Sequence, residues 1–182
     1  ALKNQVNPHF LFNSFNALLN IVEENPKDAA QLIKHLSRFY RKMTAYNNKE
    51  LISLAEEFEL LNSYLFIQSK RFGSALQVSV HADAELMRSG LIPPLVLQLL
   101  AENAIKHNSI SKENPIYINI STAGSGYLVM RNNIRPKLEK EESEGVGLQN
   151  IRNRYRLLTS KEVILENSGT EFVVWLPLLF AQ

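Results

Sequence analysis

The chain has 182 residues and a formal net charge of +2, with 45% hydrophobic residues, 21% charged residues and no cysteine. Such a composition is that of an ordinary globular chain of one or two domains, with enough length to bury a core. It excludes a disulfide framework and thiolate metal sites, and the four histidines lack the i,i+4 spacing of a zinc site.

No long basic block or alternation of aromatic and basic residues is present, so direct nucleic-acid binding is not expected. A run of 18 apolar residues and a signal peptide are also absent from the sequence. The first residue, Ala1, already follows a helix-like pattern without an initiating methionine. We therefore expect this chain to be a piece of a larger protein.

Hydrophobic periodicity predicts three helices in the first 73 residues. The first two, over residues 8–24 and 26–46, are joined by a connection so short that they form an antiparallel hairpin. The third begins with a capping box formed by Ser53 and Glu56 and ends at Gly73.

The two hairpin helices are too apolar to bury their faces only on each other. Phe12, Phe15, Leu19 and Val22 fall on one face of the first helix. Pairing with a second copy into a four-helix bundle is the favoured solution, which predicts a homodimer. The alternative is that the third helix covers these faces within one chain.

After Gly73 the apolar period changes from 3.6 to 2, and we place a domain boundary there, between residues 1–73 and 74–182. A charged stretch over residues 135–144 has no apolar periodicity and is predicted to be a mobile loop. The remaining predicted elements are strands over 76–81, 116–122, 127–133, 163–166 and 172–178, and helices over 95–108 and 148–159.

His9 stands at the start of the first helix, after Asn7 and Pro8, which act as a helix cap and first helical residue or as a proline kink. A neutral imidazole has a ring nitrogen that can act as a nucleophile. Asn13 lies four residues later on the same side of the helix and is placed to orient the ring. A lone histidine in such a position is more often structural or solvated.

Glu102, Asn103 and Lys106 form a polar cluster late in an otherwise apolar helix. A carboxylate, an amide and an ammonium group one turn apart suit Mg²⁺ bound to a phosphate, because Mg²⁺ takes few protein ligands and lysine supplies a point charge. The alternative is a solvated helix end.

Gly145 and Gly147 precede Leu148 at the start of the next helix. Glycines let the backbone approach a phosphate, and a helix N-terminus offers free N–H groups to it. A plain loop is the alternative. The charged stretch before these glycines is placed to close over a ligand as a lid.

Three motifs in this order resemble those of the LytS/YehU-type sensor histidine kinases, over nearly the whole chain. Residues 5–13 (Gln-Val-Asn-Pro-His-Phe-Leu-Phe-Asn) resemble the hallmark of the phosphoacceptor module in that family. Residues 97–107 resemble its asparagine box, and residues 145–151 followed by Arg154 resemble its second glycine box.

This resemblance implies an α+β fold: a helical hairpin for dimerisation and phosphoacceptance over residues 1–73, then a two-layer α/β sandwich ATPase domain with a mixed sheet over 74–182. It implies ATP and Mg²⁺ as cofactors, a response regulator as partner, and attachment to the inner face of the cytoplasmic membrane through a missing N-terminal region. The implied roles are phosphorylation of His9, Mg²⁺ binding by Asn103, and nucleotide binding by Glu102, Lys106, His107, Gly145, Gly147 and Leu148.

Two departures from the family pattern stand out. The aspartate of the usual first glycine box is absent, and Asn132 occupies the aligned position, where the family aspartate accepts a hydrogen bond from the adenine amino group. Many histidine kinases carry an acid directly after the phosphoacceptor, but Phe10 fills that place here, as is usual in the LytS-like branch. The general base is therefore unassigned.

The favoured function is an ATP-dependent histidine autokinase that donates phosphate to an aspartate on a response regulator. The alternative is a nucleotide-binding signalling module with impaired or absent kinase activity, which the missing aspartate suggests. A hydrolytic ATPase of gyrase type would need a carboxylate one turn before Asn103 to activate water, and Leu99 stands there.

Overall fold

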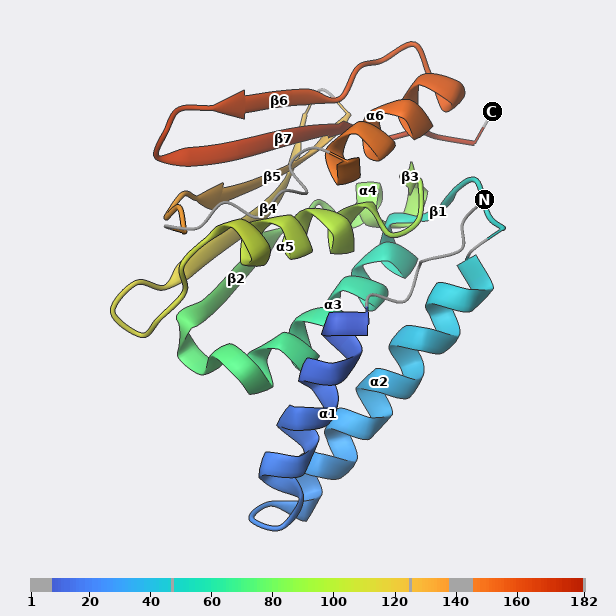
Figure 1. Ribbon diagram of the computed structural model, residues 1–182. Helices are drawn as coiled ribbons and strands as arrows, with labels where there is room; N and C mark the ends of the chain where they lie inside the picture. Colours follow the sequence, from blue (N-terminus) through green and yellow to red (C-terminus); the bar gives the residue numbers. More distant parts are fainter. Residues whose placement is uncertain (1–7, 47, 125, 138–145, 182) are drawn as a thin grey trace.

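The computed structural model describes residues 8–46, 48–124, 126–137 and 146–181. It consists of three long helices beside a layer of strands and shorter helices (Figure 1). The long helices are α1 (Pro8–Val22), α2 (Pro26–Tyr46) and α3 (Leu54–Phe72). The shorter ones are α4 (Ala84–Ser89), α5 (Val96–His107), α6 (Val146–Leu158) and the 3-10 turn η1 (Gly73–Ala75).

The main sheet is mixed, as expected. Its strand order is β2-β4-β5-β7-β6, in which β2 runs parallel to β4 and each other neighbouring pair is antiparallel. The strands are β2 (Leu76–His81), β4 (Ile116–Ala123), β5 (Tyr127–Asn133), β6 (Ile164–Asn167) and β7 (Glu171–Pro177).

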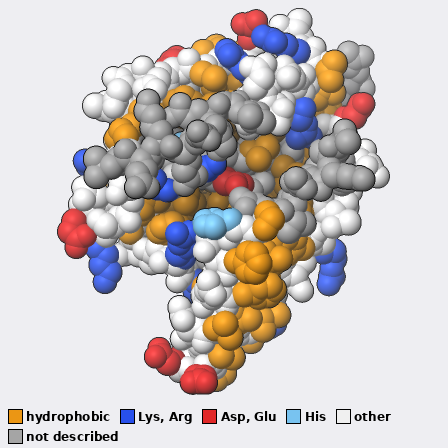
Figure 2. Space-filling view, in the orientation of Figure 1, with side chains coloured by type: hydrophobic (Ala, Val, Ile, Leu, Met, Phe, Trp, Pro, Cys, Tyr) orange, Lys and Arg blue, Asp and Glu red, His pale blue; other side chains and the backbone are white. Residues whose placement is uncertain are grey.

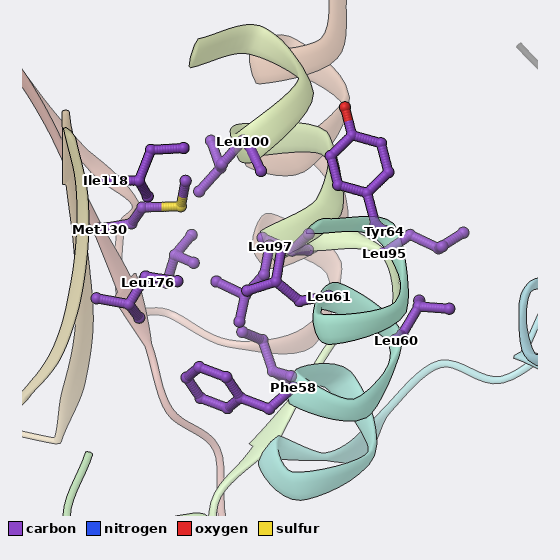
Figure 3. Close-up of a cluster of buried hydrophobic side chains, with 14 of the residues drawn as sticks. Phe58, Leu60, Leu61, Tyr64, Leu95, Leu97, Leu100, Ile118, Met130 and Leu176 are labelled. Atoms are coloured by element: carbon purple, nitrogen blue, oxygen red, sulfur yellow. The ribbon is translucent and has the colours of Figure 1, made fainter. Parts of the chain in front are cut away.

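Helices cover one face of this sheet and form its core with it. Ile118, Met130 and Leu176 point from three adjacent strands toward Leu97 and Leu100 of α5 (Figure 3). Residues on the opposite face of the same strands alternate with these core residues and are more exposed, as at Tyr117. The second half is therefore a two-layer α/β sandwich.

The expected capping box at the start of α3 is present. The Ser53 hydroxyl accepts the N–H of Glu56 at 3.2 Å, and the Glu56 carboxylate accepts the N–H of Ser53 at 2.9 Å. These two bonds satisfy otherwise unpaired N–H groups of the first turn. The helix ends before Gly73, whose positive φ of 54° suits a residue without a side chain.

Helix α3 covers part of the hairpin and leaves another part exposed. The apolar stripe of α2 is buried, and so is Phe10 of α1. By contrast, Phe12 and Leu19 of α1 are 68% and 70% exposed. The alternative that α3 covers the hairpin thus holds for part of it, and pairing of the exposed face with a second copy stays a prediction.

Two small features were not predicted. Helix α4 has no buried residue, so it produces no hydrophobic period. The strands β1 (Ile52–Ser53) and β3 (Leu91–Ile92) form a separate antiparallel pair of two residues each, too short to show alternation.

The domain boundary placed at Gly73 coincides with the end of α3. The hydrophobic core, however, is continuous across it, from Phe10 of the hairpin through α3 to Leu176 of the sheet. The division into two domains therefore stays a prediction.

Candidate functional site

His9 lies in the first turn of α1, exposed to solvent, at the end of the hairpin that is nearest α5 (Figure 1). The next residue holds it in place. Phe10 is buried, and its ring centroid lies 5.2 Å from that of Tyr64 on α3 and 5.4 Å from that of Phe39 on α2. Aromatic packing therefore fixes the backbone of this turn, whereas the imidazole is presented outward.

Asn13 contacts the imidazole, as its spacing predicts. Its Nδ2 lies 3.2 Å from His9 Nδ1 and 3.4 Å from Nε2. The amide nitrogen is therefore within reach of both ring nitrogens and restrains rotation of the ring. The tautomer of His9 decides which ring nitrogen accepts the amide hydrogen.

A cleft of about 590 Å³ brings His9 together with residues of two other helices. Helix α1 contributes His9 and Asn13, and α5 contributes Glu102 and Lys106. In Figure 2, histidine, acidic and basic side chains lie close together above the hairpin. The phosphoacceptor candidate and part of the asparagine box, about 95 positions apart in the sequence, thus line one cavity of one chain.

The third wall of this cleft is helix α3, through Tyr64, Gln68 and Arg71. Gln68 Nε2 donates a hydrogen bond of 3.0 Å to the Tyr64 hydroxyl. Burial raises the pKa of this hydroxyl above its usual range, and the charge of Glu102 adds to the rise. Glu102 in turn accepts a bond of 2.8 Å from Gln98 Nε2, one turn earlier on α5.

Asn103 faces a different direction from Glu102, because consecutive helical residues are about 100° apart. It lies against the first turn of α6. A Cβ atom at Gly147 would be 3.6 Å from Asn103 Nδ2 and 3.7 Å from Oδ1. The structure therefore brings the asparagine box and the second glycine box into contact, with a glycine where a side chain would occupy the space beside the amide.

The other predicted nucleotide residues near this contact are placed as follows. His107 is the last residue of α5 and shares the side of Asn103, four residues before it. Leu148 is half-buried and packs against the core. Gly145 and most of the predicted lid lie outside the described residues, and so does Asn7.

Asn132 lies near the end of β5 and is buried, 7% exposed, on the sheet face that also carries Met130. Its Nδ2 donates a bond of 2.7 Å to the carbonyl oxygen of Asn133.

The segment that follows β5 is hydrogen-bonded to the end of α5. The side-chain oxygen of Asn108 accepts the N–H of Arg135, and Ser109 donates its N–H to the Arg135 carbonyl. The predicted lid thus begins beside the asparagine box.

The N-terminus of α5 is held by a buried carboxylate that sequence reasoning missed. Glu57 of α3 is fully buried and accepts the N–H groups of Leu95 at 2.9 Å and Leu97 at 2.8 Å. Leu95 has a positive φ of 69°, which a branched side chain rarely adopts, so this entry into the helix is strained. Arg154 of α6 donates to the carbonyl of Pro94 at 2.7 Å and secures the same turn.

Burial raises the pKa of Glu57 to about 7, although the N–H groups of Leu97 and Leu95 and the charge of Arg154 oppose the rise. The sequence signal for Glu57 was an acid beside the apolar stripe that includes Leu54 and Phe58.

Helix α3 also contributes three side chains to the cleft that the sequence analysis did not single out. They recur at i, i+4 and i+7, and this spacing was the available signal for a functional polar face: Tyr64, Gln68 and Arg71.

Among the described residues, no group of three or more histidine, aspartate or glutamate side chains is placed to hold a metal ion. No helix in the described part of the chain is long and apolar enough to cross a membrane.

A histidine presented on a helical hairpin, next to an asparagine-bearing helix and a glycine-led helix on a mixed sheet, is the arrangement of a histidine kinase core. Comparisons with known proteins agree. The histidine kinase family profile matches residues 1–76. The chain is 34% identical to the sensor histidine kinase YpdA of Escherichia coli and 28% identical to the sensor histidine kinase/phosphatase LytS of Staphylococcus aureus, covering 97% of its own length in each case.

Over nearly its whole length the chain is therefore similar to sensor histidine kinases of the LytS/YehU type. It spans about a third (34%) of the length of these two relatives. Solved structures with a similar course of the chain include the histidine kinase AdeS of Acinetobacter baumannii (TM-score 0.44, 14% identity, 96% of this chain and 97% of that one). Another is the histidine kinase domain of the Erythrobacter litoralis EL346 blue-light activated kinase (TM-score 0.49, 15% identity, 94% and 96%).

Proposed function

We propose that this chain is the kinase core of a two-component sensor, which phosphorylates His9 with ATP and passes the phosphoryl group to an aspartate of a response regulator. The observation that carries this proposal is the cleft shared by His9, Glu102 and Lys106. The three residues come from two helices of one chain and line the same cavity, which supports the proposed roles of His9 as nucleophile and of Glu102 and Lys106 as phosphate-binding residues. It also supports autophosphorylation in cis, by the nucleotide site of the same chain.

In the proposed reaction a ring nitrogen of His9 forms a bond to the γ-phosphorus of ATP, and the bond to the β,γ-bridging oxygen breaks in line, leaving ADP. Asn13 restrains the ring, and Lys106 supplies positive charge on the same cleft wall as Glu102. Positioning and charge stabilisation account for most catalysis in phosphoryl transfer.

The nucleotide is proposed to lie beside Asn103 of α5, with its γ-phosphate directed toward the cleft that holds His9. The contact between Asn103 and Gly147 supports this, because the amide oxygen is a hard ligand suited to Mg²⁺ and the glycine leaves space beside it. Mg²⁺ would neutralise charge on the phosphates. Gly145, Leu148 and His107 are proposed to contact the phosphates and ribose, and Asn132 the adenine.

A homodimer is proposed from the exposed apolar face of α1, which is made of Phe12, Phe15, Leu19 and Val22. Ile33 of α2, in the same hairpin, is also 50% exposed. Membrane attachment through a region preceding this chain, at the inner face of the cytoplasmic membrane, is proposed from the family resemblance alone.

Incubation with γ-labelled ATP tests the proposal. We expect label that is lost in acid and kept in base, as for a phosphohistidine, and no label in His9→Gln. That variant should keep its fold and its affinity for ATP, because the imidazole is exposed and lies apart from the Asn103–Gly147 contact. Label that persists in the variant and maps to His35, His81 or His107 would contradict the assignment. ATP binding without any labelling would indicate a signalling module without kinase activity.

A further inference from the structure

We propose that Arg154 is a positioning residue for the nucleotide site: it fixes helix α6 on helix α5 so that Gly147 lies beside Asn103. The inference deepens the proposed function and rests on its assignment of the nucleotide to the contact between these two residues. That contact alone does not determine how α6 lies along α5, because a glycine has no side chain with which to hold a neighbouring helix. The position of α6 therefore depends on a second attachment.

Arg154 provides this second attachment. Its Nη1 donates a hydrogen bond of 2.7 Å to the carbonyl oxygen of Pro94, just before the start of α5. Gly147 and Arg154 are seven positions apart, or about two helical turns, so they lie on the same face of α6. The first of them meets the later part of α5 and the second meets its beginning, so the two helices run in opposite directions. Two contacts about two turns apart restrict both sliding and rotation of α6 on α5.

The peptide group that accepts the bond from Arg154 is also held from its other side. This group joins Pro94 to Leu95, and the Leu95 N–H donates to the Glu57 carboxylate of α3 at 2.9 Å. The carbonyl and the N–H of a trans peptide point in opposite directions, and none of the described peptide bonds is cis. One peptide plane is therefore bonded to α6 through its oxygen and to α3 through its nitrogen. It directly precedes the strained φ of 69° at Leu95, where the backbone most needs external support.

The surroundings of this side chain favour arginine over other residues. Arg154 is half-buried, and the fully buried carboxylate of Glu57 interacts with its charge. A guanidinium group carries several N–H donors in a rigid fork, so one donor can bond a carbonyl while the charge faces an acid. Lysine would keep the charge and a single point of donation, whereas methionine would keep neither. Arg156, two residues later on the same helix, is exposed and serves as the matched control.

Titration of ATP with Mg²⁺ into Arg154→Met, Arg154→Lys and Arg156→Met tests this role. We expect the dissociation constant to rise about ten-fold in Arg154→Met, because α6 loses its second attachment. Arg154→Lys should restore most of the affinity, since an ammonium group can donate one bond to the Pro94 carbonyl. Arg156→Met should bind as the wild type does. The labelling rate at saturating ATP should stay at the wild-type level in all three, because no described residue of α6 lines the cleft with His9.

A double-mutant cycle separates positioning from a general loss of packing. In an Asn103→Ala background the amide is absent, so Arg154→Met should weaken ATP binding by less than about two-fold there. An equal loss in both backgrounds, or an unchanged dissociation constant in Arg154→Met, would overturn the inference. If Arg154→Met does not fold, Arg154→Gln replaces it in the cycle, because its shorter, uncharged side chain also gives up the attachment.

The same measurements distinguish this inference from the proposed function. ATP binding by the wild-type chain without labelling would refute the kinase reaction, and the dissociation constants would still decide the role of Arg154. Labelling of the wild type with equal ATP affinity in Arg154→Met would refute only the positioning role. A wild-type chain that binds no ATP would refute both.

Discussion

The carboxylate of Glu57 caps a helix to which it does not belong: it accepts the N–H of Leu97, in the first turn of α5, at 2.8 Å. The acid comes from α3, the helix that also forms a wall of the His9 cleft. One buried side chain therefore fixes the start of the helix that carries Glu102, Asn103 and Lys106 relative to α3.

This relationship predicts a pH dependence of stability. The pKa of Glu57 is about 7 in the folded state against an ordinary 4.5, so the folded state binds more protons than the unfolded state between these values. The stabilisation is complete below pH 4.5 and is lost as the pH rises to about 7. From pH 5 to 8 the unfolding free energy of the wild type should fall by about 2–3 kcal/mol relative to Glu57→Gln. Denaturant unfolding at several pH values measures it, and parallel pH curves would contradict it.

Autophosphorylation in cis predicts the behaviour of mixed dimers. Chains with His9→Gln and chains with Asn103→Ala, carrying different tags, are co-expressed and purified through both tags. The Asn103→Ala chain keeps its histidine but has lost its own nucleotide contact, so it should stay unlabelled beside a partner with an intact nucleotide site. Mixed dimers of wild type with His9→Gln are the control and should label the wild-type chain. Label on the Asn103→Ala chain would show transfer between chains.

The exposed face of α1 predicts that the fragment is a dimer. Replacing Phe15 and Leu19 together with glutamate would bury two unpaired charges in the interface, at several kcal/mol for each. We expect light scattering to give a dimer for the wild type and a monomer for the double variant, with unchanged helical content. Asn62→Glu with Gln77→Glu, both at exposed positions outside the hairpin, is the control. A wild-type monomer at tens of micromolar would contradict the prediction.

Asn132→Asp is expected to alter base selectivity. A carboxylate accepts a stronger hydrogen bond from the adenine amino group than an amide does, by roughly 1 kcal/mol or about five-fold in affinity. The aspartate also loses the bond that Asn132 donates to the Asn133 carbonyl, so the variant without nucleotide should melt at a lower temperature. Because inosine triphosphate lacks the adenine amino group, the affinity of the variant should rise for ATP more than for inosine triphosphate. Titration of both nucleotides into both proteins measures this ratio. An equal change for both nucleotides would mean that position 132 does not contact the adenine amino group.

Local signals in the sequence were sufficient for most of the fold. The change of period at Gly73, the capping box at Ser53 and the glycines near residue 147 each depend on near neighbours in the chain, and the structure has the corresponding elements. The sequence analysis assigned Asn103 and Gly147 to two motifs that resemble one family, and the structure shows these residues in contact.

The missed parts depend on distant contacts. The carboxylate of Glu57 meets the N–H of Leu97 only after packing of α3 against α5, and no local pattern encodes that pairing. The placement of His9 in a cleft with Glu102 likewise results from the packing of Phe10 on Tyr64. The sequence analysis put these two sites in separate domains, because periodicity marks elements and not their arrangement.

The pairing of Leu91 with Leu179 has a consequence for the order in which the molecule is completed. Each residue donates its N–H to the carbonyl of the other, at 2.7 and 2.9 Å, just beside the short pair formed by β1 and β3. A ribosome adds residues from the N-terminus onward, so the hairpin and α3 emerge long before Leu179 does. Strand β3, which precedes α5 in the chain, therefore acquires its second backbone partner only when residue 179 has been synthesised. Until then one edge of this strand is unpaired.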